Sequence, residues 1–170
     1  DSVPVTLMAV TMTAVTFAAT IDRVLNGLTR PFFGWISDMI GRENTMFIAF
    51  GMEGIGIWGL YMLGHDPVWF VLLSGFVFFA WGEIYSLFPS TAADYFGTRH
   101  ATSNYAVLYT AKGVASIIGG WVGALLFEQS GSWAVGFYGS AVMALIAAGM
   151  AVGLRATNLT AKARAANLAP

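Results

Sequence analysis

The sequence has little charge. Only 10% of its 170 residues are Asp, Glu, Lys or Arg, whereas soluble domains carry about a quarter. Seventeen such side chains cannot solvate the surface of a compact water-soluble domain of this size. The mean hydropathy of +0.69 agrees with this, and together they exclude an aqueous enzyme and a disordered tail. The net charge of −1 provides no field that attracts polyanions, so no nucleic-acid partner is predicted.

Cysteine is absent, which excludes a disulfide scaffold and a thiolate metal site. His65 and His100 have no second His or acid at metal-ligand spacing, so we predict neither a metal nor a cofactor. The first residue is Asp1, and no basic segment precedes an apolar stretch, so no signal peptide is visible. We expect the chain to be a piece of a longer membrane protein.

Long apolar runs are abundant in this sequence. A hydrocarbon core of about 30 Å is crossed by about 20 apolar residues of helix. Short polar or Gly/Pro breaks separate the runs, which makes neighbouring helices antiparallel. We therefore predict an all-α membrane protein with five transmembrane helices. Their approximate ranges are 3–37, 44–63, 68–93, 103–127 and 133–154, within a bundle over 1–155 that a tail, 156–170, follows.

The cations outside the spans lie on one side of the predicted bundle. With five antiparallel spans, the breaks at 38–43 and 96–102 share a side with the tail. That side holds Arg42, Arg99, Arg155, Lys162 and Arg164, and the opposite side has no Lys or Arg. The positive-inside rule then predicts a cytoplasmic C-terminus in a multi-pass protein of the cell (inner) membrane.

Arg23, Arg30 and Lys112 are cations within predicted spans. Lys112 lies near the middle of a span that has no other charge, where an ammonium costs about 2.5–3.5 kcal/mol. It is tolerated beside a wet cavity or an anion, or as a structural partner of a buried acid. Arg30 precedes Pro31, which cannot donate to Gly27. The first helix either continues through Arg30 or ends near Ile21, which would make Arg23 and Arg30 juxtamembrane cations.

Acidic residues also fall within the spans. Glu53 and Glu83 are deep in the second and third, and each is either a protonated carboxyl or a counter-ion to a membrane cation. Asp22 and Asn26 share a helix face with Arg30. Two rows of small residues predict close helix contacts: Ala115, Gly119 and Gly123, and Gly136, Ser140, Ala144 and Ala148.

One motif resembles that of a superfamily. The stretch from Gly34 to Arg42, GWISDMIGR, resembles the cytoplasmic G-x-x-x-D-x-x-G-R loop of major facilitator transporters. The resemblance implies that Asp38 and Arg42 join helix ends and take part in switching between states. Met39 and Glu43 stand where that family usually has cations, so this copy is degenerate.

Three further segments resemble helices of the oxalate–formate antiporter family. Residues 26–35 (NGLTRPFFGW) resemble its eighth helix, residues 81–90 (WGEIYSLFPS) its tenth, and residues 104–116 its eleventh. The resemblance runs from about residue 8 to residue 155. It implies helices eight to twelve of a twelve-helix transporter, a partial C-terminal six-helix bundle whose partner is the missing N-terminal half.

The resemblance also implies a substrate site. Arg30 and Lys112 would face the central cavity and bind the two carboxylates of a small dianion. Trp81 and Tyr85 would form part of the aromatic wall, and Tyr109 stands where the oxalate carrier has a Trp. Glu83 replaces a small residue, and the pair Asp22-Arg23 replaces an uncharged polar pair. These departures leave room for a carboxylate other than oxalate.

We therefore predict a secondary active transporter that exchanges small carboxylate anions of the oxalate or formate type by alternating access. The alternative is a proton-coupled monocarboxylate symporter. Related monocarboxylate transporters have an Asp one turn before the equivalent Arg, whereas this chain has Asn26. Exchange is favoured unless Glu83 or Asp22 supplies a proton site. An enzyme is disfavoured because paired His or Asp clusters are missing, and a structural or receptor module is a further rival.

Overall fold

The computed structural model describes the backbone of residues 5–82 and 84–168 and the side chains of residues 12–82 and 86–159. Six helices account for nearly all of this backbone, which contains no strand. They are α1 (Val5–Ile40), α2 (Arg42–Leu63), α3 (Pro67–Trp81), α4 (Ile84–Phe96), α5 (Ala101–Ser130) and α6 (Ala134–Leu168). The predicted all-α fold is confirmed.

Four regions of the described chain are long and apolar enough to cross a membrane. They are α2, the pair α3 and α4, α5, and α6 as far as Leu159. The helix α1 is not among them, although it runs unbroken for 36 residues through Asp22, Arg23, Arg30 and Pro31. Among the described residues, length and composition thus identify four of the five predicted spans.

The segment 68–93, predicted as one span, holds the two helices α3 and α4, which lie on either side of position 83, outside the described residues. Gly82 ends α3 and lies against Thr29 of α1, where a Cβ atom would collide with the threonine hydroxyl. Pro89 lies inside α4 and cannot donate a backbone hydrogen bond. At the other end of the chain, α6 continues as a helix to Leu168, through most of the predicted tail.

Local sequence explains the sharp turns between helices. Gly41 separates α1 from α2 with φ of 92°, a conformation that residues with a Cβ atom rarely adopt. Asp66 caps α3, since its carboxylate accepts hydrogen bonds from the backbone N–H groups of Val68 and Trp69. Gly131 ends α5 in the left-handed region, and its N–H donates to the carbonyl of Phe127. These turns reverse the chain within a few residues.

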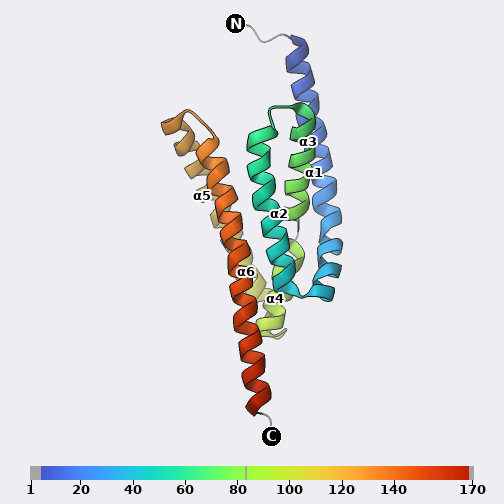
Figure 1. Ribbon diagram of the computed structural model, residues 1–170, viewed down its shortest axis with the longest axis vertical. Coiled ribbons are helices and arrows are strands. Elements are labelled where there is room, and N and C mark those ends of the chain that lie inside the picture. Colours follow the sequence, from blue (N-terminus) through green and yellow to red (C-terminus); the bar gives the residue numbers. More distant parts are fainter. Residues whose placement is uncertain (1–4, 83, 169–170) are drawn as a thin grey trace.

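The helix α2 lies between α3 and α6, as Figure 1 shows. Gly54 of α2 faces Leu145 and Ala141 of α6, and Gly56 faces Phe76 and Val77 of α3. The other side of this contact is a row of buried alanines on α6: Ala141, Ala144, Ala148 and Ala151. Small side chains on both helices let the backbones approach closely.

The helix α5 is arranged differently. It passes behind α6 in Figure 1, away from the group formed by α1, α2 and α3, and its main neighbour is α4. None of its residues is buried. Its apolar side chains are correspondingly exposed, as Ile117 (75%) and Trp121 (66%) show.

Candidate functional site

Arg30 lies on α1, one turn after Asn26 and directly before Pro31. Its Nη2 donates to the Asn26 Oδ1 atom at 3.3 Å. This bond fixes the orientation of the asparagine, because the amide oxygen is the acceptor and the amide nitrogen must point away. The guanidinium is therefore held by a neutral side chain on the same helix face.

Lys112 lies near the middle of α5 and is half-buried. Its Nζ atom is 4.8 Å from the centroid of the Trp81 ring and 5.3 Å from that of the Tyr109 ring. Both distances are within the range of a cation–π interaction. The positive charge of Arg30 also acts on Lys112. The structure thus brings Lys112 of α5 to Trp81 of α3, beside Tyr109 of its own helix and within the electrostatic influence of Arg30 on α1.

Two residues of the predicted site cannot be placed. Glu83 lies outside the described residues, and the side chain of Tyr85 does too. Of the predicted aromatic wall, the structure therefore describes the side chain of Trp81 and not that of Tyr85. Phe78 packs edge-on to Trp81 with ring centroids 5.9 Å apart, which orients the indole from within α3.

Asp22 is 7% exposed and faces α3. The Ser74 hydroxyl donates to its Oδ2 atom at 2.7 Å, whereas its Oδ1 atom is buried without a hydrogen-bond partner. The Nδ2 atom of Asn26, one turn along α1, is also buried and without a partner. Glu53, the other in-span acid that the structure describes, is half-buried on α2 beside Gly54.

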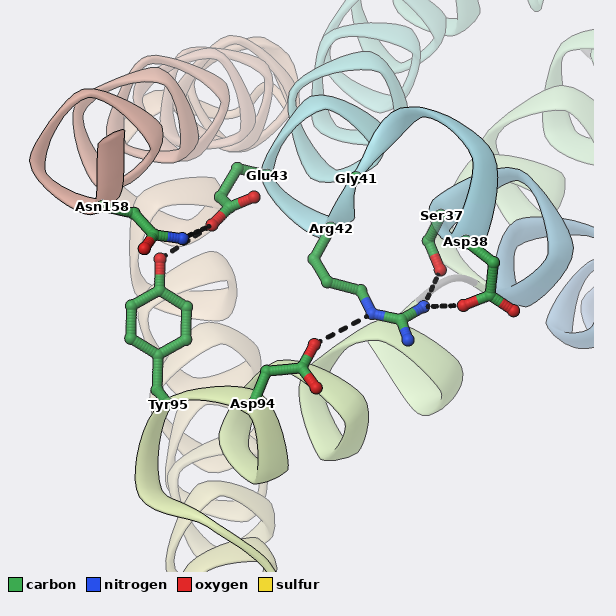
Figure 2. A pocket seen from close by; sticks show the side chains of 8 residues that line it. All are labelled: Ser37, Asp38, Gly41, Arg42, Glu43, Asp94, Tyr95 and Asn158. Atoms are coloured by element: carbon green, nitrogen blue, oxygen red, sulfur yellow. Dashed lines mark hydrogen bonds and ion pairs between the residues drawn. The ribbon is translucent and has the colours of Figure 1, made fainter. Parts of the chain in front are cut away.

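A second group of polar side chains lies at the end of the bundle where α1 meets α2 (Figure 2). Arg42 forms ion pairs with Asp38 at 2.7 Å and with Asp94 at 3.2 Å, and its Nη1 atom also donates to the Ser37 hydroxyl. Asp94 belongs to α4. One guanidinium therefore connects the end of α1, the start of α2 and the end of α4.

Glu43 makes the second set of contacts at this end. Its Oε1 atom accepts hydrogen bonds from the Tyr95 hydroxyl at 2.7 Å and from Asn158 Nδ2 at 2.9 Å. The two donors come from α4 and α6. Glu43 and Arg42 thus connect the first turn of α2 to three other helices, around a cavity of about 350 Å³.

No group of three or more His, Asp or Glu side chains that could hold a metal ion occurs among the residues that the structure describes. The arrangement offers two other kinds of chemistry. The first is attraction of an anion by a cation beside aromatic rings, and the second is a set of polar contacts between helix ends.

The family model of the Major Facilitator Superfamily matches residues 3–169. The chain belongs to the major facilitator superfamily. Its members are transporters, so this membership favours transport over catalysis. Four membrane-length apolar regions agree with a multi-pass integral membrane protein of this superfamily.

Curated proteins similar to the chain include a named antiporter. The chain is 37% identical over 139 residues to the oxalate:formate antiporter of Oxalobacter formigenes, which covers 81% of this chain and 33% of the relative. It is 29% identical over 100 residues to an uncharacterised MFS-type transporter of Escherichia coli strain K12, covering 59% of the chain and 25% of that protein. A 38 kDa protein of Thermoproteus tenax is 28% identical over 134 residues, which cover 76% of this chain and 35% of that protein. The matched part of the chain thus spans between a quarter and about a third of the length of these relatives.

The structure places several of the predicted site residues in separate pairs or small groups, and it adds others. Asp38 and Arg42 are paired, and Arg30 contacts Asn26. Sequence analysis missed Asp94, Tyr95 and Asn158, although the predicted spans place 94–95 on the same side as the 38–43 break. It also missed Ser74, because a lone serine in an apolar helix carries no signal of what it contacts.

Proposed function

We propose that the protein of which this chain is part exchanges small carboxylate anions across a membrane by alternating access. The observation that carries the proposal is the position of the Lys112 ammonium beside the Trp81 and Tyr109 rings, where the charge of Arg30 from another helix also acts on it. Similarity to a protein named oxalate:formate antiporter supports this substrate class. Because the chain spans about a third of that relative, the other side of the cavity is assigned to the missing N-terminal half.

The two cations differ in the geometry with which they bind a carboxylate. A guanidinium presents a planar fork that matches one carboxylate bidentately, whereas an ammonium is a compact point charge. A dicarboxylate would bridge Arg30 and Lys112 and remove the repulsion between them. The aromatic rings provide an apolar wall that strengthens these interactions by excluding water.

Exchange follows from the same electrostatics. Closing the cavity around two cations without an anion leaves both poorly solvated, whereas closing around a dianion neutralises them. The difference favours the occluded state only when substrate is bound. A carrier that cannot close empty cannot return empty, which is the requirement for obligate exchange.

The network around Arg42 is assigned to gating. It contains polar contacts between α1, α2, α4 and α6 at a single end of the bundle, so movement of these helices relative to one another would make and break them. We place this end in the cytoplasm of a cell (inner) membrane protein, because every predicted loop cation lies on the same side.

The first experiment uses the complete protein in proteoliposomes loaded with unlabelled oxalate, and it follows uptake of labelled oxalate. Arg30→Lys should lower the exchange rate about tenfold or more, because the charge remains while the bidentate fork is lost. Arg23→Lys is the matched control, since Arg23 lies on the same helix and is exposed. Full exchange by Arg30→Lys would contradict the proposal.

A pH gradient across empty vesicles separates exchange from the symport alternative. Exchange requires internal anion and proceeds without a gradient. Uptake into empty vesicles driven by an acidic exterior would instead establish proton-coupled symport and direct attention to the acids of the spans.

A further inference from the structure

A second cavity lies between α1, α2 and α3, and it shares no lining residue with the polar cavity of Figure 2. Its volume is about 240 Å³. The walls include Phe32 and Phe33 of α1, Phe79 of α3, and Ile48 and Met52 of α2. The three phenylalanine rings contact one another, with centroids 5.4 or 5.5 Å apart. They therefore form one continuous aromatic wall.

The lining of this cavity offers nothing to a polar ligand. Thr45 carries the one hydroxyl among the described lining residues, and that hydroxyl donates to the Gly41 carbonyl at 2.9 Å within α2. Thr45 is also fully buried. Buried water needs polar partners, and an apolar cavity of about 150 Å³ stays dry and takes up benzene. We therefore expect the cavity to exclude water and to accept hydrocarbon.

The rim of the cavity lies on the side of α1 away from the candidate anion site. Phe32 follows Arg30 by two residues, which places the two side chains about 200° apart around the helix. At the rim, Phe32 is 41% exposed and Ile48 is 44% exposed. Ile55, two turns further along the same face of α2, is 62% exposed. Because α2 is long and apolar enough to span a membrane, this exposed face borders on lipid hydrocarbon.

Size and polarity decide which kind of molecule can enter. A helix with its side chains is about 10–12 Å wide, which is too wide for a cavity of this volume. An extended peptide would bring backbone N–H and C=O groups into a dry space without partners, which is costly. A hydrocarbon chain has neither disadvantage, and it provides the dispersion contacts that the lining atoms of an empty cavity lack.

The depth of the cavity indicates which part of a lipid fits it. Thr45 and Met52 follow Arg42 by three and ten residues, which is about 5 and 15 Å along the axis of α2. Arg42 and its ion pairs mark the polar end of the bundle. A lipid headgroup at the level of Arg42 would therefore place the first half of its acyl chain at the depth of the cavity.

We propose that this apolar cavity binds one acyl chain of a membrane lipid, from the leaflet at the end of the bundle where α1 meets α2. The chain lies against the aromatic wall that Phe33 and Phe79 help to form. It supports α1 directly after Pro31, where the helix lacks the hydrogen bond to the Gly27 carbonyl. The proposal is independent of the proposed function, because the anion site takes no part in it.

The test is photolabelling of the complete protein in vesicles of dioleoylphosphatidylcholine. A small fraction of the lipid is phosphatidylcholine with a diazirine on one acyl chain, and peptide mass spectrometry locates the labelled residues after irradiation. We expect label on Phe33 and Met52. Phe33 is decisive because it is 2% exposed, so lipid that only coats the outer surface does not reach it. Label confined to exposed positions such as Ile55 would overturn the proposal.

Ile48→Trp enlarges a rim side chain and should lower the labelling of Phe33 at least about fivefold, because the indole takes the space of the acyl chain. Ile55→Trp is the matched control, since it makes the same change on the same exposed face outside the cavity and should leave the labelling unchanged. Unaltered thermal unfolding midpoints show that both variants fold.

Phe32→Trp narrows the rim from α1 and provides a second test if Ile48→Trp does not fold. Labelling of Phe33 that persists in the narrowed variants would overturn the proposal. A cavity covered by another segment of the complete protein gives a different result: Phe33 and the rim residues remain unlabelled while Ile55 is labelled. That result would also overturn the assignment to lipid.

Discussion

The helices α2 and α5 use the same small residue in opposite ways. Each carries four glycines within one or two turns of its middle. In α2, Gly54 and Gly56 lie so close to α6 and α3 that an added Cβ atom would come within about 3 Å of their side chains. In α5, nothing lies within 4 Å of where a Cβ atom would be on any of its glycines.

The difference shows what a row of small residues specifies. Such a row provides a surface that another helix can approach closely, but it does not determine which helix packs there. The partners of α2 are in this chain, and they hold it at its middle and at its first turn. The helix that carries Lys112 is joined mainly to α4, so the glycine flank of α5 remains available to segments outside the described residues.

The largest expected effect comes from filling the glycine surface of α2, and the same change in α5 is its comparison. Gly56→Leu in α2 should destabilise the complete protein by at least about 1–3 kcal/mol, because the new side chain collides with Phe76 and Val77. Gly119→Leu in α5 should leave the thermal unfolding midpoint in detergent nearly unchanged. Equal destabilisation by both substitutions would break the comparison, because it would show that α5 is packed as tightly as α2 by a helix beyond this chain.

A smaller effect is expected at the first turn of α2. Arg42→Met removes two ion pairs and one hydrogen bond, and it should cost about 1 kcal/mol, since Asp38 and Asp94 are more than half exposed and water screens their charges. Hydrogen–deuterium exchange should increase over residues 42–48 and remain unchanged in α5. Arg99→Met, in the exposed loop before α5, is the control. Unchanged exchange in α2 would mean that its glycine contacts alone hold this end.

The smallest effect is expected for Glu43→Gln. Glutamine retains an oxygen that can accept from Tyr95 and Asn158, so stability should change by only a few tenths of a kcal/mol. Measurement of unfolding midpoints at low and high salt checks this. A loss above about 1 kcal/mol that salt reduces would show that the negative charge, rather than the hydrogen-bond geometry, connects α2 to α4 and α6.

Most of the fold could be predicted because length and hydropathy dominate helix formation in a membrane. The exceptions depend on packing. The close approach of Gly82, after α3, to Thr29 of α1 joins residues 53 positions apart. The row predicted as Gly136, Ser140, Ala144 and Ala148 is displaced, because the buried face of α6 is formed by Ala141, Ala144, Ala148 and Ala151.

The candidate site was predictable where a residue was out of place for its segment. A Lys in an apolar span and an Arg before a proline are unusual in the sequence itself, so they can be identified before their neighbours in the fold are known. Ser74 and Asn158 are ordinary residues for their positions, and only the packing of α1 on α3 and of α6 on α2 gives them partners. Glu43 was noted only as a departure from a motif, and its contacts give that departure a structural role.

The position of Trp81 has an optical consequence. Its indole lies 4.8 Å from the ammonium of Lys112, so the electric field at the ring depends on whether that charge is neutralised or moves. Indole emission shifts with the local field, and the chain's other five tryptophans can be replaced by phenylalanine. Trp81 is therefore a fluorophore within the candidate site, and its emission wavelength would change when an anion binds.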